Sequence, residues 1–177
     1  ESQSGMSIES LSHQIDLVRW IIGEVETVYA RVIASHSELP GVDDNIHAVF
    51  GLDNGVTATL HVSWSSHLQF NTTGINGTDG TVRIWGAGGA DHDTMYQHFR
   101  GATAEEQTVL GEKYDEQIMA NECRGFLELI ERRESGSAGV SCPGIDDGLR
   151  ALEISHAMLT SSRENRVVDV SGSVPQA

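Results

Sequence analysis

Residues 46–64 read IHAVFGLDNGVTATLHVSW, and this stretch decides the fold class of the chain. Apolar residues occupy every second position in both halves, so each half is typical of a strand with one buried and one polar face. Asn54-Gly55 separates the two halves, and this dipeptide favours the tight turn of a β-hairpin. The stretch therefore predicts two adjacent antiparallel strands.

Further strands and three helices are predicted outward from this hairpin. A second hairpin joins 68–75 to 81–85, and single strands are expected at 25–34 and 166–170. Apolar residues recur at helical spacing in the three remaining periodic segments, 7–22, 114–133 and 145–163. In the last of these, the expected buried stripe consists of Leu149, Leu152, His156 and Leu159.

Helices stand before and after the hairpins and do not alternate with single strands. This order predicts an α+β fold: an antiparallel or mixed open-faced β-sheet with helices packed on one face. The chain has 177 residues, which suits a single domain spanning 1–177. Between 86 and 111 the periodicity is lost in glycine-rich and polar sequence, so we expect a loop excursion there.

The charge of the chain excludes some classes of partner. It carries 26 acidic and 11 basic side chains, a net charge of −15, which repels nucleic acid and anionic membranes. No apolar run approaches the roughly 20 residues that span a bilayer. Two cysteines are too few for a disulfide framework, so we expect a cytoplasmic protein. The acidic surface also suggests the hypothesis of a halophilic source.

Three polar residues on the first predicted helix form a candidate site. Glu9, His13 and Asp16 follow each other at i, i+4 and i+7, so they share one side of a continuous helix. Carboxylates beside an imidazole favour its protonated form and can fix its tautomer, which suits proton exchange near neutral pH. A solvated helix face or a structural histidine would give the same spacing.

Several segments resemble one known family. Residues 12–23, SHQIDLVRWIIG, resemble the H-x-x-D-x-x-R-W-x-x-G signature of the second domain of the Gfo/Idh/MocA oxidoreductases. Residues 43–64 are similar to the strand pair of that domain, 74–82 to its glycine-rich hairpin, and 147–168 to its closing helix and strand. The resemblance covers most of the chain outside 86–111.

The resemblance implies that two domains have different roles. In that family a Rossmann-type first domain binds NAD or NADP, and the second domain supplies substrate contacts and an open sheet face for oligomerisation. It implies that His13 is a catalytic proton-transfer residue or a partner of the substrate hydroxyl beside the nicotinamide, that Glu9 tunes it, and that Asp16 binds substrate or orients the helix. The family has aspartate where this chain has Glu9.

The parts of the family that bind the cofactor are not found in this sequence. No G-x-G-x-x-G opens a βαβ unit, and Lys113 follows Glu112 but precedes Tyr114, not the proline of the family's lysine motif. We therefore expect the chain to lack the Rossmann domain, to bind neither cofactor nor metal by itself, and to transfer no hydride alone.

These observations favour one function and leave two others open. The favoured one is the substrate-binding and oligomerisation domain of an NAD(P)-dependent oxidoreductase that acts on a sugar, polyol or related hydroxylated compound. A noncatalytic binding or assembly module could use the same fold. A metal-dependent enzyme is the third hypothesis, with Asp91-His92-Asp93 and His98 as the local cluster of ligand types.

Overall fold

The computed structural model describes residues 5–35, 40–67, 71–85, 95–100, 103–109, 116–135 and 143–170. The chain divides into two compact units, one made of Glu1–Ser66 with Pro143–Ala177 and the other of His67–Cys142. We describe each unit by itself, and the single domain over 1–177 stays a prediction.

The first unit contains a four-stranded sheet and three helices. In chain order its elements are α1 (Met6–Glu9), α2 (Leu11–Ile21), β1 (Val25–Ile33), β2 (Asn45–Leu52), β3 (Thr57–Ser63), α4 (Ile145–Glu164) and β8 (Val168–Asp169). The strand order is β3-β2-β1-β8, and every neighbouring pair is antiparallel. The hairpin predicted from residues 46–64 is confirmed, because Phe50 pairs with Ala58 and Ala48 with Leu60 across β2 and β3.

The second unit contains a separate sheet and one helix. Its elements are β4 (Thr72–Asn76), β5 (Thr81–Trp85), β6 (Met95–Arg100), β7 (Thr103–Val109) and α3 (Glu116–Ser135), and its strands follow the order β4-β5-β6-β7. The hairpin of β4 and β5 is confirmed, whereas the loop expected at 86–111 is wrong for β6 and β7. These two strands carry mainly polar residues, so the alternation of apolar residues is missing, and they are defined only by the pairing of β6 with β5 and of β7 with β6. The rest of 86–111 lies outside the described residues.

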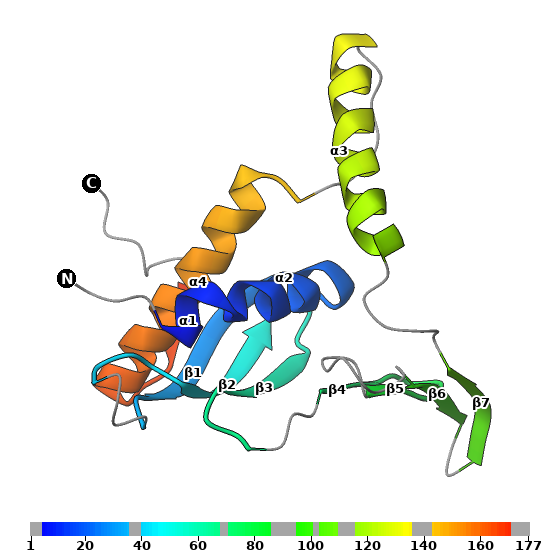
Figure 1. The fold of residues 1–177 in the computed structure, drawn as a ribbon. Coiled ribbons are helices and arrows are strands. Elements are labelled where there is room, and N and C mark those ends of the chain that lie inside the picture. The colour runs from blue at the N-terminus through cyan, green and yellow to red at the C-terminus, as the bar shows by residue number, and fades with distance from the viewer. Residues whose placement is uncertain are drawn as a thin grey trace. The chain divides into compact units, whose positions relative to one another are not determined.

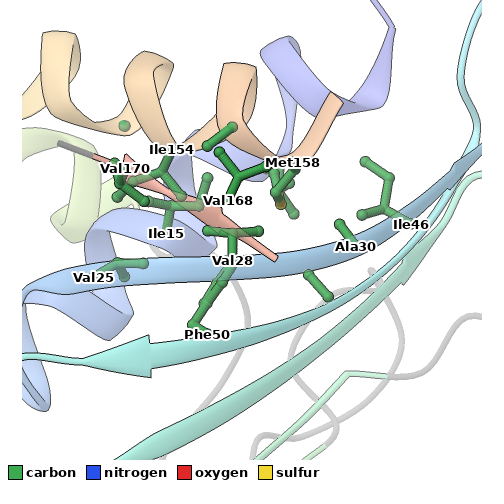
Figure 2. Close-up of a cluster of buried hydrophobic side chains, with 14 of the residues drawn as sticks. Ile15, Val25, Val28, Ala30, Ile46, Phe50, Ile154, Met158, Val168 and Val170 are labelled. Atoms are coloured by element: carbon green, nitrogen blue, oxygen red, sulfur yellow. The ribbon is translucent and has the colours of Figure 1, made fainter. Parts of the chain in front are cut away.

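In the first unit the helices cover one face of the sheet and leave the other open. Figure 1 shows α1, α2 and α4 on the same side of β1 and β2. Inward-facing residues of the two strands alternate with exposed ones, as in the burial of Val28 and Ala30 on either side of Tyr29. Figure 2 shows Ile154 and Met158 of α4 above these two strand residues, with Phe50 from β2 in the same cluster. This arrangement confirms the α+β class with an open-faced antiparallel sheet.

Helix α4 buries a different stripe from the one that its sequence suggests. Leu149 and Leu152 are 54% and 41% exposed, and His156 is exposed as well. The buried side chains lie on the neighbouring stripe and include Ala151, Ile154, Ser155, Ala157, Met158 and Ser161. Small residues allow the helix to approach the sheet closely, so close packing determines which of the two stripes is buried.

The serines of α4 also complete the hydrogen bonding of β1. Strand β8 pairs with β1 only at Thr27 and Val28. Farther along β1, the backbone N–H of Ala30 donates to Ser161 Oγ at 2.9 Å, and that of Val32 donates to Ser162 Oγ at 2.8 Å. The edge of β1 beyond β8 is therefore satisfied by side chains of the covering helix.

None of the helices in the described part of the chain is both long and apolar enough to cross a bilayer.

Candidate functional site

The helix that carries the candidate residues is interrupted. Glu9 ends α1 and His13 lies in α2, with Ser10 between the two helices, so the single helix predicted for 7–22 is wrong. Met6 and Leu11 are both fully buried. Residues five apart on a continuous α-helix point about 140° away from each other, and here both are buried across the break at Ser10.

A partly buried contact fixes the first of these helices. The N–H of Met6 donates to the Asp43 carbonyl at 3.0 Å, and the Ser7 N–H donates to Asp43 Oδ2 at 2.6 Å. Gly5 packs so closely on Asp43 that a side chain on residue 5 would overlap its carboxylate. Helix α1 is thereby held against the loop that precedes β2.

The structure leaves the predicted proton-transfer residue accessible. His13 and Glu9 are exposed and Asp16 is half-buried, whereas Leu11 and Ile15 of the same helix are fully buried. Helix α2 is thus fixed by its apolar side and presents His13 on the other. Because Glu9 belongs to α1, its predicted effect on His13 no longer follows from the spacing along one helix and stays a prediction.

Asp16 belongs to an ion-pair network centred on Arg19. The Arg19 side chain is only 13% exposed, and its Nη1 lies 3.4 Å from Asp16 Oδ1. Its Nε lies 3.0 Å from Glu24 Oε2, and its Nη2 lies 3.4 Å from Asp147 Oδ1 in the first turn of α4. Arg19 therefore connects the end of α2 with the residue before β1 and with the start of α4.

A second arginine closes this network from the other side. Arg150 Nε lies 3.0 Å from Glu24 Oε1, and its Nη1 lies 2.9 Å from Glu153 Oε2. Its Nη2 donates to the Val25 carbonyl at 2.9 Å. Glu24 thus accepts hydrogen bonds from two guanidinium groups and, through Oε1, from the Val25 N–H at 3.1 Å.

The electrostatics of the network favour its charged state. Burial tends to raise the pKa of Glu24, but hydrogen bonds from Arg150 and Arg19 and the attraction of both cations lower it below its ordinary value of 4.5. Burial likewise tends to lower the pKa of Arg150, while hydrogen bonds to Glu153 and Glu24 raise it. Asp16 contacts the arginine that anchors α2, and its orienting role stays a prediction.

Backbone conformation and close packing explain why a glycine stands at the end of α2. Gly23 has φ +153°, and a Cβ there would lie 2.8 Å from Asn54 Nδ2. Asn54 belongs to the β2–β3 turn, and its Nδ2 donates to the Ile22 carbonyl at 2.7 Å. Only glycine permits both this backbone conformation and this approach of the turn.

The alternative metal cluster is not supported by the described residues. Asp91, His92 and Asp93 lie outside them, and His98 lies in β6. Within the described ranges, no three His, Cys, Asp or Glu side chains come together in a group that could hold a metal ion.

The described residues also do not fit a dinucleotide-binding fold. NAD-binding domains rest on parallel βαβ units whose glycine-rich turn leads into a helix. All strand pairs in the described part of both sheets are antiparallel. No NAD(P) contact is therefore assigned to this chain.

Three important residues of this region were missed by the sequence prediction. Arg19 was noted only as a motif letter, and neither Glu24 nor Arg150 was singled out. Their partners lie up to 128 positions apart in the chain. The sequence offered one signal: an arginine in the α2 motif, and acidic and basic residues at the predicted start of α4 that could join it in a network.

Comparison with known proteins agrees with the fold. Residues 1–83 match the family model of the GFO/IDH/MocA C-terminal domain. Among curated proteins none matches the chain.

Three solved structures illustrate the similarity. An Agrobacterium radiobacter oxidoreductase in complex with NAD+, L-tartaric acid and magnesium is 19% identical, with a TM-score of 0.73 over 94% of this chain and 49% of its own. Levoglucosan dehydrogenase in complex with NADH and L-sorbose is 21% identical, with a TM-score of 0.74 over 98% of this chain and 51% of its own. The Caulobacter crescentus aldose-aldose oxidoreductase, complexed with glycerol, is 22% identical, with a TM-score of 0.72 over 93% of this chain and 48% of its own.

The chain thus spans about half the length of the solved structures that it matches. The sequence match covers 1–83, and the likeness in fold extends over nearly the whole chain. Together they confirm the resemblance read from the sequence: residues 1–83 match the GFO/IDH/MocA C-terminal domain, and the likeness over the rest of the chain is one of fold.

Proposed function

We propose that the chain is the substrate-side domain of an NAD(P)-dependent oxidoreductase that acts on a sugar, polyol or related hydroxylated compound. The names of similar structures support this class, since they include a levoglucosan dehydrogenase and an aldose-aldose oxidoreductase, and two of the structures hold NAD+ or NADH. In such a parent enzyme a nicotinamide held by another domain would accept the hydride.

The observation that carries the proposal is the accessibility of His13 on an anchored helix. Leu11 and Ile15 hold α2 to the core, and Arg19 ties its C-terminal end to Glu24 and α4. A hydroxyl group that becomes a carbonyl must lose its proton, and an exposed imidazole on a rigid support can accept it. Glu9 is proposed to tune this exchange and Asp16 to orient α2.

The test uses the complete gene product, assayed with NAD+ and NADP+ against a panel of aldoses and polyols. We expect His13→Ala to lose most of the turnover and to keep its affinity for the cofactor, measured by fluorescence titration. His156→Ala is the matched control, because His156 is also an exposed helical histidine but lies on α4. Turnover that is equal in the two variants would remove His13 from the mechanism.

The sequence upstream of Glu1 provides an independent test. A βαβ unit with a glycine fingerprint and a Glu-Lys-Pro motif there would support the oxidoreductase. An upstream region that has neither feature would favour the noncatalytic binding or assembly module.

One observation supports assembly of this chain, in the enzyme as well as in the module. The open face of the first sheet carries Tyr29, Ile33 and Val49, which are 39%, 41% and 42% exposed. We propose that a second copy covers this face in a homo-oligomer. Val49→Glu should shift the sedimentation of the purified chain towards monomer, and Val56→Glu, at an exposed position in the turn, is the control. A monomeric parent chain at high protein concentration would refute this proposal.

A further inference from the structure

A row of basic side chains crosses the open face of the first sheet. It consists of Arg31 on β1, His47 on β2 and His61 on β3, which are paired in the antiparallel register. Tyr29 and Val49, paired with each other, lie two positions to one side of this row, and Ile33 lies two positions to the other side. A second copy that covers these three exposed residues therefore covers the basic row between them.

The two imidazoles of this row are stacked. Their ring centroids are 4.1 Å apart, with an angle of 10° between the planes. Ile46 and Ala48, the neighbours of His47, are buried in the core, so the pleat of the strand fixes the side to which its ring projects. The nitrogens of parallel rings point along the ring planes, so neither ring accepts a hydrogen bond from the other. A proton taken up by one imidazole is therefore not shared with its neighbour.

The charge of the row depends on pH. Arg31 is always charged, and imidazole is the side chain that ordinarily gains its charge between about pH 8 and pH 5. In the four described strands of this sheet, the acidic residues are Glu26 and Asp169, which adjoin Thr27 and pair with it, respectively. Thr27 is about 13 Å from Arg31 along β1, at roughly 3.3 Å per residue. These carboxylates therefore leave the row without a neutralising charge in the same chain.

We propose that protonation of His47 and His61 separates the second copy from this face, so that the homo-oligomer is stable at neutral pH and dissociates in acid. The inference rests on the homo-oligomer proposed above. In the separated chain, water solvates the charged rings and lets them move apart. In the oligomer, two like charges beside Arg31 are covered and lose that water.

The symmetry of such an interface strengthens the effect. A two-fold interface uses the same patch on both copies, so the basic rows of both lie within it. The separated chain then binds protons more tightly than the oligomer, and acidification shifts the equilibrium towards the separated chain.

The general charge of the chain acts in the opposite direction. Its net charge is −15, so acidification makes each copy less negative and reduces the repulsion between copies. That effect alone would tighten association in acid. Weaker association in acid is therefore a specific sign of the basic row. The anchoring network keeps its charge in mild acid, because the pKa of Glu24 lies below its ordinary value of 4.5.

The test is sedimentation equilibrium of the complete gene product at about pH 8 and pH 5.5, at constant ionic strength. We expect the Kd of self-association of the parent to be at least about tenfold weaker at the lower pH. The ratio should fall in His47→Gln and in His61→Gln, and in the double variant the Kd should change less than about threefold or become tighter. His156→Gln, at an exposed position of α4, should keep the parent ratio.

A second set of variants separates this inference from the proposal on which it rests. Val49→Glu shows whether the measured oligomer uses the open face, and threonine at position 47 or 61 replaces a glutamine variant that folds poorly. An oligomer that Val49→Glu weakens, but whose parent Kd is equal or tighter at the lower pH, would overturn the switch and leave the homo-oligomer standing. A parent that is monomeric at both pH values, or an oligomer that Val49→Glu leaves unchanged, would overturn both.

Discussion

Replacing Glu24 with glutamine tests the ion-pair network that anchors α2. The substitution keeps the size of the side chain and one carbonyl oxygen, and it removes the negative charge shared by Arg19 and Arg150. Both arginines remain in place: Arg19 keeps Asp16 and Asp147 at 3.4 Å, and Arg150 keeps Glu153 at 2.9 Å. The variant therefore isolates the charge of Glu24.

The expected loss of stability follows from the number and burial of the pairs. Glu24 makes two ion pairs of 3.0 Å, and exposed pairs of this kind contribute up to about 1 kcal/mol each. The Arg19 side chain is 13% exposed, so weakening its ion pair costs more free energy of unfolding than it would at a fully exposed site. The Glu24 side chain is 37% exposed, which limits that loss. We expect Glu24→Gln to lower the free energy of unfolding by about 1–2 kcal/mol.

The contribution should depend on pH in one direction. The pKa of Glu24 is lowered in the folded state, so its stabilising effect is fully present above its ordinary value of 4.5. The effect is lost as the pH falls through the lower folded-state pKa, where the carboxylate of the native protein takes up a proton. The difference between parent and variant should therefore be constant near neutral pH and shrink under acidic conditions.

The assay is urea unfolding followed by circular dichroism at several pH values. Glu164→Gln is the matched control, since Glu164 pairs with Arg166 at the exposed end of α4 and should change stability by less than about 0.5 kcal/mol. Equal stability of the two variants at neutral pH would refute the reasoning. So would a difference that persists unchanged below the folded-state pKa.

Three further substitutions and one control test the packing of the first unit, each by urea unfolding. Gly23→Ala should cost about 1–3 kcal/mol, because it imposes a side chain at φ +153° against Asn54, whereas Gly148→Ala on α4, with open space around its Cβ, should be neutral or stabilising. Phe50→Ala should cost about 3–5 kcal/mol, since its fully buried ring leaves a cavity in the core. Ser161→Ala should cost about 1–3 kcal/mol, because it leaves the Ala30 N–H and the Arg166 carbonyl without the hydroxyl group between them.

The predictable parts of this protein are those with a local signal. Alternation of apolar residues and Asn54-Gly55 predicted the β2–β3 hairpin, and residues 12–23 led to the family through a contiguous motif. His13 is exposed on the side of the first helical segment that faces away from Leu11 and Ile15, as the spacing predicted. Such signals survive in the sequence because each depends on neighbours within a few positions.

Only the tertiary structure decided the features that depend on segments far apart in the chain. The first helix is broken at Ser10 with Met6 and Leu11 buried on either side of the break, and contact with β1 determines which stripe of α4 is buried. The joining of Arg19 to Asp147, 128 positions away, depends on α4 returning beside α2. A periodic pattern records which side of an element is apolar, but the partner of a charged side chain is fixed only when packing brings distant elements together.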